Sequence, residues 1–292
     1  NPNQKAFFIS NSKFNIINNK ISGKEIGYNN IVDISDGLSC LKEFDSPTCV
    51  IIKHNNPCGV ASSNNISKAF VKACQSDPIS SFGGVVLLNK KIGKELATII
   101  NKNFYEVVVA PSFDAEALNI LMSKKNLIIL NSKNLKEFKG LSFKTVNSGT
   151  LYQDTNSIKI SRYQIKSVSD KKTNKKNIED LIFAMKVAKH VKSNSIVLVK
   201  NKQTLGIGAG QMSRLDATKI ALMKLNNYFK NKKFICASDA FFPFTDSIKI
   251  LNKNGCQAII QPSGSINDNK IIDYSKKNRL PLYFINNRFF KH

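Results

Sequence analysis

The stretch TCVIIKHNNPCGVASSNNISKAFVKACQSDPISSFGGVVLLN, residues 48–89, decides the class of fold. Residues 48–52 are an apolar, largely β-branched run with the length of a buried strand. Either Asn64 or Asn65 can cap the helix that follows, whose apolar residues recur at helical spacing. Residues 85–88 are a second apolar run, which predicts another strand. Strand, helix and strand in this order predict an α/β fold with an at least partly parallel sheet.

The alternation of strands and helices continues along the chain, with one interruption. Residues 107–110 and 127–130 predict further strands, each reached through a helix pattern. A polar, lysine-rich stretch at residues 131–177 breaks the alternation, and a second series follows it. We therefore predict two similar α/β halves, residues 1–150 and residues 151–292, of which the second begins with a helical connection. The second series comprises helices at 178–189, 214–227, 268–277 and after Asp246, and strands at 196–199, 234–237, 257–260 and 282–285.

The charge of the chain is strongly positive. The formal net charge is +24, from 44 Lys and Arg against 20 Asp and Glu. Most of the basic residues are single lysines dispersed among abundant Asn and Ile, which indicates a general compositional bias rather than one built binding face. A basic nucleic-acid-binding module is the alternative that the charge suggests, and a salt-sensitive affinity for RNA or DNA would favour it. The chain lacks the interleaved aromatic and basic residues of the usual RNA-binding modules, so we expect no nucleic-acid partner.

The apolar runs and the cysteines bear on the compartment. Hydrophobic residues make up 42% of the chain, yet the longest apolar runs are far too short to cross a bilayer, so no membrane partner is expected. The chain does not open with the charged and apolar pattern of a signal peptide. The six cysteines form no CxxC pair, and we interpret Cys49, Cys74 and Cys236, which lie within apolar stretches, as small buried hydrophobes in a reducing compartment, the cytoplasm. With three histidines in the chain, no metal site of the His/Cys type is predicted.

Polar segments beside predicted strands are the first candidates for chemistry, because ligands of α/β sheets bind beyond the carboxyl ends of strands. Lys53 and His54 directly follow the strand at 48–52. A lysine can stabilise developing negative charge, and a histidine can move a proton near neutral pH. A loop with two solvated cations is the alternative interpretation. Asn194, before the strand at 196–199, could donate an amide hydrogen bond to an oxyanion or could belong to an ordinary helix-to-strand turn.

Three further segments are candidates for binding. The glycines of residues 206–214 let backbone N–H groups approach an anion, with Arg214 as a charged tip, although neither the dinucleotide nor the P-loop pattern is met. Residues 238–246 hold three aromatics and two acids, which suit either a flat heterocycle or a hydrophobic plug with Asp246 as a helix cap. Arg288, in the basic and aromatic C-terminal tail, could bind phosphate if the tail docks.

Seven motifs in order give the chain a resemblance to a known family. They are KHNNPCG, SFGG, VKSNSIV, GIGAGQMSR, ASDAFFPF, QPSGSI and RFFKH, beginning at residues 53, 81, 191, 206, 237, 261 and 288. Together they closely resemble the transformylase domain of the bifunctional purine biosynthesis enzyme AICAR transformylase/IMP cyclohydrolase. The resemblance covers nearly the whole chain, and seven ordered motifs are far more specific than any one of them.

The resemblance implies a reaction. The 5-amine of aminoimidazole carboxamide ribotide (AICAR) attacks the formyl group of 10-formyltetrahydrofolate, the co-substrate, in de novo IMP biosynthesis. By resemblance, His54 takes the proton from the amine, and Lys53 stabilises the charge on the formyl oxygen or the leaving nitrogen, with Asn194 assisting. A weak, delocalised amine needs a nearby base, and a tetrahedral oxyanion needs positioned donors. No catalytic metal is required, and a structural monovalent cation is compatible with the resemblance but is not predicted.

The resemblance also implies binding residues and a quaternary structure. The family is a homodimer with active sites across the subunit interface, and its domain looks like two cytidine-deaminase-like halves without the deaminase zinc. The missing His-x-Glu and Pro-Cys-x-x-Cys signatures argue against the remaining alternative, a zinc deaminase on the related fold. The AICAR-binding positions are matched by Gly83, Glu106, Asn194, Arg214, Phe241 and the phosphate contact Arg288, and the folate-binding positions by Leu215, Asp246, Ser265 and Ile266.

The chain departs from the family at its start. The family has Arg-Tyr-Gly-x-Asn-Pro-His-Gln where this sequence reads Asn1-Pro2-Asn3-Gln4, so Asn3 replaces His and the Arg-Tyr pair is missing. That pair helps to hold the nucleotide phosphate in the family, and we expect weakened AICAR binding from the sequence as it stands. The family's N-terminal cyclohydrolase domain is absent from this sequence, so no IMP-forming activity is expected from this chain. The stretch at 131–177 also looks shortened.

Overall fold

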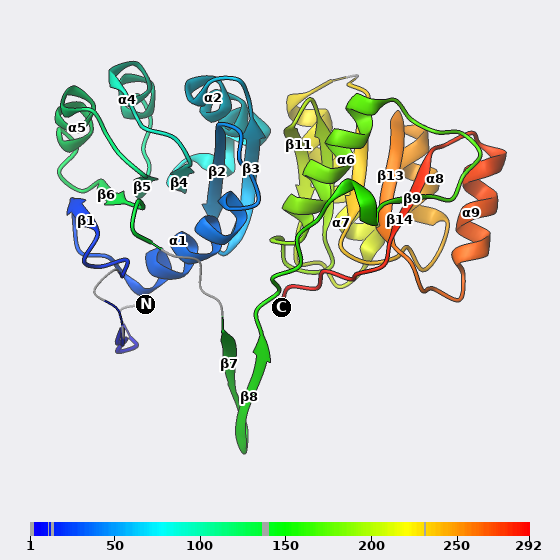
Figure 1. The fold of residues 1–292 in the computed structure, drawn as a ribbon, viewed down its shortest axis with the longest axis horizontal. Coiled ribbons are helices and arrows are strands. Elements are labelled where there is room, and N and C mark those ends of the chain that lie inside the picture. Colours follow the sequence, from blue (N-terminus) through cyan, green and yellow to red (C-terminus); the bar gives the residue numbers. More distant parts are fainter. Residues whose placement is uncertain (1–2, 11, 13–14, 136–139, 231) are drawn as a thin grey trace.

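A single twelve-stranded mixed sheet runs through the protein in the computed structural model, which describes residues 3–10, 12, 15–135, 140–230 and 232–292 (Figure 1). The strand order is β1-β6-β5-β4-β2-β3-β11-β10-β12-β13-β14-β9. The strands of the first half are β1 (Lys20–Ser22), β2 (Thr48–Lys53), β3 (Asn56–Ser62), β4 (Val85–Leu88), β5 (Val107–Ala110) and β6 (Ile128–Asn131). Those of the second are β9 (Lys166–Ser167), β10 (Ile196–Lys200), β11 (Gln203–Gly208), β12 (Phe234–Ser238), β13 (Cys256–Pro262) and β14 (Leu282–Ile285).

The two halves of the sheet have the same topology. The first half reads β3-β2-β4-β5-β6-β1 from the middle outward, and the second reads β11-β10-β12-β13-β14-β9. In each half a hairpin, two parallel pairings and an antiparallel edge strand follow in the same order. The halves join where β11 pairs with β3, Gln203 opposite Ala61. The α/β prediction is confirmed, and the boundary expected between residues 150 and 151, which falls inside β8 (Gly149–Asp154), stays a prediction.

The helices cover the sheet in a matching way, because alternate strand residues point to opposite faces. One core contains Val50 and Val197 and lies under one helix from each half. Two separate cores on the other face lie under three helices each, and contain Ile51 and Leu198. The shared face carries α1 (Tyr28–Leu41) and α6 (Lys175–Ala188), and the other face carries α2 (Ile66–Ser76), α4 (Lys94–Asn101), α5 (Ala115–Met122), α7 (Arg214–Tyr228), α8 (Asp246–Lys253) and α9 (Asp268–Lys277), with α3 (Pro78–Ser81) beside α2.

Most of the predicted helices and strands lie where the periodicity of apolar residues predicted them. The Asn65 side chain accepts a hydrogen bond from the Lys68 backbone N–H at 3.1 Å, which makes it the cap of α2. The sequence YNNIVDISDGLSCL of α1 was not predicted as a helix, because Asn, Asp, Ser and Gly are poor helix formers. This helix is held by tertiary packing instead, since Ile34 is fully buried in the shared core.

Two segments predicted as loops are strands. Pro57 and Gly59 lie in β3, and Gly206 and Gly208 lie in β11, each the second strand of a hairpin. A Cβ on Gly208 would stand 1.9 Å from the Ala217 carbonyl oxygen of α7. Gly59 has the same relation to α2, at 2.1 Å from a helix carbonyl oxygen. The glycines therefore let a helix press onto the strand, and the prediction of an anion loop at 206–208 is wrong.

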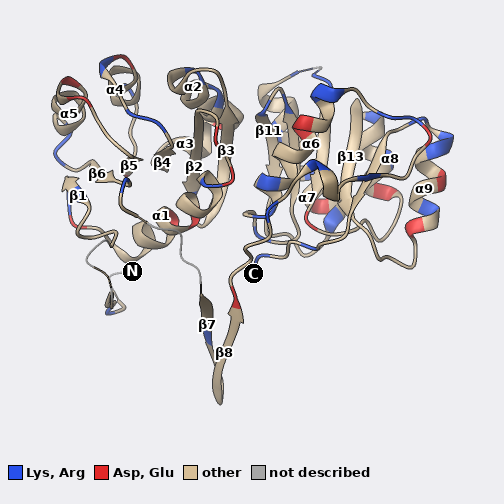
Figure 2. Cartoon of the chain, in the orientation of Figure 1, with Lys and Arg blue, Asp and Glu red and all other residues tan. Residues whose placement is uncertain are grey.

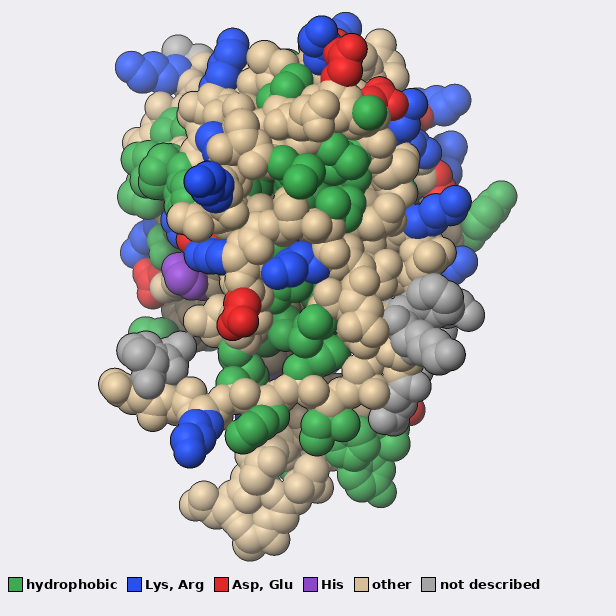
Figure 3. All heavy atoms as spheres, turned by 90° about the vertical axis from the view of Figure 1, so that its left-hand side faces the viewer, with side chains coloured by type: hydrophobic (Ala, Val, Ile, Leu, Met, Phe, Trp, Pro, Cys, Tyr) green, Lys and Arg blue, Asp and Glu red, His purple; other side chains and the backbone are tan. Residues whose placement is uncertain are grey.

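The charged side chains are dispersed, and no described helix is both long and apolar enough to cross a membrane. Figure 2 shows Lys and Arg on both halves, and in the space-filling view of the β1 end they are scattered among neutral side chains (Figure 3). A separate hairpin of β7 (Leu141–Val146) and β8 projects from the body within the stretch that breaks the alternation (Figure 1).

Candidate functional site

Strand directions bring the candidate residues to one edge of the sheet. From β2 through β3, β11 and β10 to β12, every strand is antiparallel to the one before it. The end of β2, the start of β10 and the end of β12 therefore lie at the same edge. β4 is antiparallel to β2, so Gly83 and Glu106, just before β4 and β5, lie at the same edge. The segments after β13 and β14, with Ser265, Ile266 and Arg288, also lie there.

Lys53 and His54 lie at the tight turn between β2 and β3. His54 and Asn55 have positive φ angles of 51° and 63°, as in the two-residue turns that suit hairpins. The Asn55 backbone N–H donates to Asp33 Oδ1 of α1 at 2.7 Å, and burial raises the pKa of that carboxyl although this hydrogen bond opposes the shift. His54 is exposed, while the Lys53 ammonium donates to the Phe82 carbonyl oxygen at 2.7 Å.

Gly83 and Glu106 are placed beside this turn. Gly83 has a φ of 70°, and a Cβ there would lie 3.9 Å from Lys53 Nζ and 3.5 Å from the Phe104 ring. The Glu106 backbone N–H donates to the Gly84 carbonyl oxygen, and its carboxylate pairs with Lys24 Nζ at 2.5 Å. The sequence analysis missed Lys24, and no motif singled it out.

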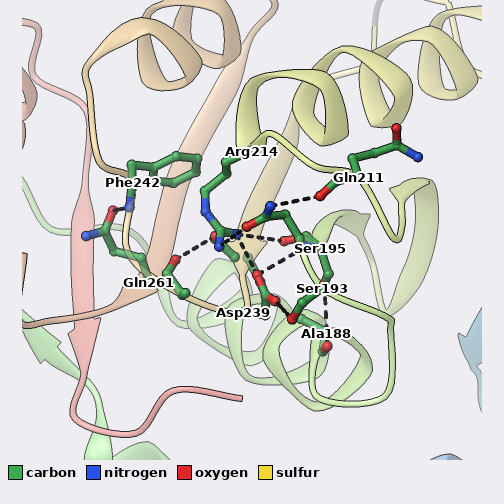
Figure 4. A network of polar contacts seen from close by, with 12 residues as sticks. Ala188, Ser193, Ser195, Gln211, Arg214, Asp239, Phe242 and Gln261 are labelled. Atoms are coloured by element: carbon green, nitrogen blue, oxygen red, sulfur yellow. Dashed lines mark hydrogen bonds and ion pairs between the residues drawn. The ribbon is translucent and has the colours of Figure 1, made fainter. Parts of the chain in front are cut away.

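Arg214 is the centre of a buried polar network on the second half (Figure 4). Its guanidinium pairs with Asp239 Oδ1 at 2.5 Å and donates to Asn194 Oδ1 at 2.7 Å. Asp239, which is fully buried, also accepts from the Ser193 hydroxyl and from the Ser195 backbone N–H. The aromatic and acidic segment at 238–246 therefore uses its first carboxylate to hold an arginine, which the spacing of the sequence did not indicate.

The Asn194 side chain is engaged within its own chain. Its amide nitrogen donates to the carbonyl oxygens of Gln211 at 2.8 Å and Met212 at 3.2 Å, and its oxygen accepts from Arg214. Both amide hydrogens thus have acceptors. Asn194 holds the segment after β11 against the start of β10.

A cavity of about 510 Å³ brings five predicted residues together on the second half. Arg288 lies outside its lining but stacks over one of these residues, with its Cζ 4.7 Å from the Phe241 ring centroid. Arg288 is exposed and also donates to the Gly264 carbonyl oxygen at 3.3 Å. Ser265 accepts from the Asn267 backbone N–H, and Ile266 is fully exposed. The predicted residues in the lining are Asn194, Arg214, Leu215, Phe241 and Asp246, joined by Phe244 and Phe290.

Lys53 and His54 line a different cavity, of about 230 Å³, between the halves. Its wall also holds the Asp77–Lys224 ion pair, which the sequence analysis missed because the two residues are far apart in the chain. Lys53 and Lys224 both line this cavity, and each ammonium donates to an oxygen of the chain, that of Phe82 or that of Asp77. The Asn56 side chain, in the wall of this cavity, accepts from the Lys192 backbone N–H at 2.9 Å.

The C-terminal tail docks against both the Lys53-His54 turn and the Arg214 network. Phe289 is fully buried, and its backbone N–H donates to the Asp239 carbonyl oxygen at 3.0 Å. The Lys291 ammonium pairs with Asp36 of α1 at 3.0 Å and donates to the Asn55 carbonyl oxygen at 3.3 Å. The tail thus connects the Lys53 turn to the Arg214 network, which meets the condition set for Arg288 as a phosphate contact.

The cysteines are free thiols, and the expected burial is confirmed for Cys49 and Cys236 but not for Cys74, which is half-buried. Cys58 and Cys74 are half-buried by exposed area, yet burial of their sulfur raises the pKa to about 12 and about 11. Among the described residues, no group of three or more His, Cys, Asp or Glu side chains is placed to hold a metal ion.

The fold and the candidate site define an internally duplicated α/β protein in which residues of both halves meet at one edge of the sheet. The family model described as the AICARFT/IMPCHase bienzyme matches residues 1–224, and the chain belongs to this family. Similar proteins are the bifunctional purine biosynthesis proteins PurH of Caldicellulosiruptor bescii, 46% identical over 299 residues, and of Acetivibrio thermocellus, 45% identical over 299 residues. The alignment covers all of this chain in both cases, and the chain spans 58% of the length of these relatives. PurH of Buchnera aphidicola subsp. Schizaphis graminum is 45% identical over 278 residues, 94% of this chain and 53% of that protein.

Proposed function

We propose that this chain is an AICAR formyltransferase, which transfers the formyl group of 10-formyltetrahydrofolate to the 5-amine of AICAR. The observation that carries the proposal is the gathering of the Lys53-His54 turn, Gly83, Glu106 and the Arg214 cavity at one edge of the sheet. Membership of the AICARFT/IMPCHase family supports it. The relatives are named for purine biosynthesis, and the chain contributes the part of such a protein that carries these residues.

The proposed roles come from the family resemblance, and the geometry of each group is compatible with them. His54 is exposed on a rigid turn, so its ring is available to take a proton from the amine. Lys53 is half-buried and held by the Phe82 carbonyl oxygen, so its charge is positioned for the oxyanion or leaving nitrogen without a metal ion. Arg288, exposed and stacked on Phe241, is the proposed phosphate contact. Asn194 is proposed to support the site by holding Arg214 and the segment after β11.

The cavity on the second half is proposed to take the folate. Leu215, Phe241 and Phe244 supply apolar walls for a pteridine ring, and Asp246 supplies a carboxylate that can accept from ring N–H groups. Ser265 and Ile266, on the turn after β13, are proposed to extend this surface. Each half, with its hairpin and parallel strands between helices, is further proposed to be cytidine-deaminase-like in fold.

The complete site is proposed to form between two copies of the chain. Lys53 and His54 line one cavity and Asn194, Arg214 and Phe241 line another, so one chain presents two partial sites. One exposed aromatic residue is close to each partial site: Phe82, whose carbonyl oxygen accepts from Lys53, is 57% exposed, and Phe244, in the lining of the second cavity, is 64% exposed. Aromatic side chains are enriched in protein–protein interfaces, which is compatible with a subunit contact at these sites.

The test is formation of tetrahydrofolate that requires both AICAR and 10-formyltetrahydrofolate. Lys53→Ala and His54→Ala are expected to lower kcat by roughly a hundredfold or more each. Lys200→Ala is the matched control, because Lys200 begins the equivalent turn between β10 and β11 at the opposite edge of the sheet. Unchanged rates in both site variants, or equal losses in the control, would show that the Lys53-His54 turn does not perform the chemistry.

A further inference from the structure

The turn that presents Lys53 and His54 has a structural copy in the second half of the chain. Each half has a hairpin whose two turn residues have positive φ angles, 51° for His54 and 63° for Asn55 in the first, and 52° for Asn201 and 54° for Lys202 in the second. The second of these turns, the copied turn (residues 201–202), lies at the opposite edge of the sheet and lines neither cavity of the candidate site. The copied turn therefore shows what such a turn needs in order to fold.

Both turns are anchored by a carboxylate at the same position of the helix that covers their half. Asp33 and Asp180 are the sixth residues of α1 and α6. Asp33 Oδ1 accepts from the Asn55 backbone N–H at 2.7 Å, and Asp180 accepts from the backbone N–H groups of the two copied-turn residues, each at 2.8 Å. A carboxylate offers several acceptor sites, so it can satisfy the N–H groups of a turn. Because both halves have this anchor, it is part of the fold itself.

A second contact distinguishes the first turn from its copy. The Asp36 carboxylate of α1 pairs with the Lys291 ammonium at 3.0 Å, and this ammonium donates to the Asn55 carbonyl oxygen at 3.3 Å. The equivalent position in α6 is Phe183, which is buried in the shared core and carries no charge. The fold therefore forms such a turn without a charged pair at this position.

The carbonyl group of the second turn residue is also held in different ways. At the copied turn the Lys202 carbonyl oxygen accepts from the Ser62 backbone N–H of β3 at 2.9 Å, next to the pairing that joins the halves. At the first turn the Asn55 carbonyl oxygen accepts from Lys291 of the C-terminal tail. Strand pairing fixes the copied turn, whereas the orientation of the first turn depends on one ammonium and the carboxylate that holds it.

The Asp36–Lys291 pair is well placed to keep this orientation. Both side chains are largely shielded from water, with 25% and 23% of their area exposed, and a shielded pair is weakened less by solvent and salt than an exposed one. The Lys291 ammonium also donates to the His190 carbonyl oxygen at 3.3 Å, after α6. Arg288, the proposed phosphate contact, is on the same tail. The pair therefore fixes the turn relative to the tail that carries that contact.

We propose that Asp36 and Lys291 are positioning residues for the proposed formyl transfer, acting through the Asn55 carbonyl group on the turn that presents Lys53 and His54. The inference rests on the proposed function, in which these two presented side chains act on the formyl group and the amine. Asp36 and Lys291 themselves are assigned no contact with a substrate. Loss of the pair lets the turn adopt orientations in which the reacting groups are misplaced, so the rate of the bound complex falls more than the affinity for AICAR.

The first test is the separate measurement of kcat and of KM for AICAR on the full chain. Asp36→Ala is expected to lower kcat about tenfold to a hundredfold and to change KM less than about threefold. Asp36→Asn, which keeps an acceptor for the Lys291 ammonium, should restore part of kcat. Lys291→Met should add little to the effect of Asp36→Ala in the double variant, because the two residues act as one pair. The proposal is overturned by an unchanged kcat in Asp36→Ala or by losses that multiply in the double variant.

Asp180→Ala is the matched control for folding, because it removes the anchor of the copied turn and leaves the first turn intact. This variant is expected to lower the midpoint of denaturation and to leave kcat of the folded protein unchanged. A loss of kcat as large as that in Asp36→Ala would show that a general loss of stability lowers the rate, and would overturn the proposal.

A second measurement follows the turn without any turnover. The exchange of the Asn55 backbone N–H with solvent, observed by NMR, is expected to be at least about tenfold faster in Asp36→Ala than in the unmodified chain, because a turn that opens locally exposes its N–H groups. The Lys202 backbone N–H in the same sample is the internal control and should exchange at an unchanged rate, since global unfolding would speed both. Equal changes at the two groups, or no change at Asn55, would overturn the proposal. A chain in which the pair holds Asn55 but which transfers no formyl group contradicts the proposed function alone, so the two failures are distinguishable.

Discussion

Glu43 and His190 occupy equivalent positions in the two halves, and Oε1 of Glu43 lies 3.2 Å from Nε2 of His190. Each residue comes two positions after the last residue of a fourteen-residue helix, α1 or α6. The Lys189 ammonium joins them, 2.7 Å from the same oxygen, and both ends of the contact are almost buried. The two halves are therefore held together at equivalent positions by a cluster of charged and polar side chains, although the residues at these positions differ.

This cluster predicts loss of stability in mild acid. Burial lowers the pKa of His190 despite Glu43, and the hydrogen bonds from His190 and Lys189 lower the pKa of Glu43 although burial opposes them. A depressed pKa means that the unfolded chain binds more protons, so the stabilisation is present above the unfolded pKa and is lost as pH falls. Unfolding by urea should become easier from about pH 6.5 downward for His190 and from about pH 4.5 for Glu43. His190→Asn should flatten the first part of this dependence, and an unchanged slope would contradict the assignment.

Gly83→Ala should impair the chemistry more than the fold. The residue has a φ of 70°, where a side chain costs about 1–2 kcal/mol, and its methyl group would point toward Lys53. We expect kcat/KM for formyl transfer to fall by roughly tenfold to a hundredfold, because relief of the strained φ would shift the backbone next to Phe82, whose carbonyl oxygen holds Lys53. Gly255→Ala is the control with the same backbone strain, since Gly255 has a φ of 90° and open space around its Cβ. An equal loss of activity in both variants would mean that backbone strain alone, and not the neighbourhood of Lys53, lowers the rate.

Gly208→Ala should destabilise the whole second half. The added methyl group would stand 1.9 Å from the Ala217 carbonyl oxygen, so α7 would have to move off β11. We expect a loss of about 3 kcal/mol in the free energy of unfolding, as for overpacked cores. Gly149→Ala, which meets no atom within 4 Å, should change the stability little. Chemical denaturation of the two variants gives the comparison, and equal midpoints would refute the close helix–strand contact.

Asp239→Asn should leave the Arg214 guanidinium buried without a counter-charge. Breaking a buried pair from one side costs about 3–5 kcal/mol. Replacing both residues by apolar ones should restore part of that loss. Glu179→Gln is the control, because the Glu179–Lys202 pair at 3.0 Å is half exposed and should contribute less than about 1 kcal/mol. Denaturation midpoints that fall equally for both single variants would mean that Arg214 is solvated rather than buried.

Much of the fold could be predicted from local patterns. The helix at 268–277 and the strand at 282–285 have the predicted bounds, because their periodicity is set by neighbouring residues. β3 and β11 were missed because proline and glycines mark them as loops, while their real constraint is a helix packed directly on each strand. The β7–β8 hairpin was likewise read as part of an interruption, since its residues bury nothing within the chain.

The sequence by itself determined the α/β class, the seven ordered motifs and the family to which the chain belongs. It also singled out the Lys53-His54 turn and the residues of the Arg214 cavity. Only the tertiary structure decided that the two predicted halves share one sheet, that Asn194 and Asp239 hold Arg214, and that the Lys53-His54 turn and the Arg214 network line separate cavities. The physical reason is range: strand and helix signals lie within ten or so residues, whereas register, buried ion pairs and cavity walls join residues that only the packed sheet brings together.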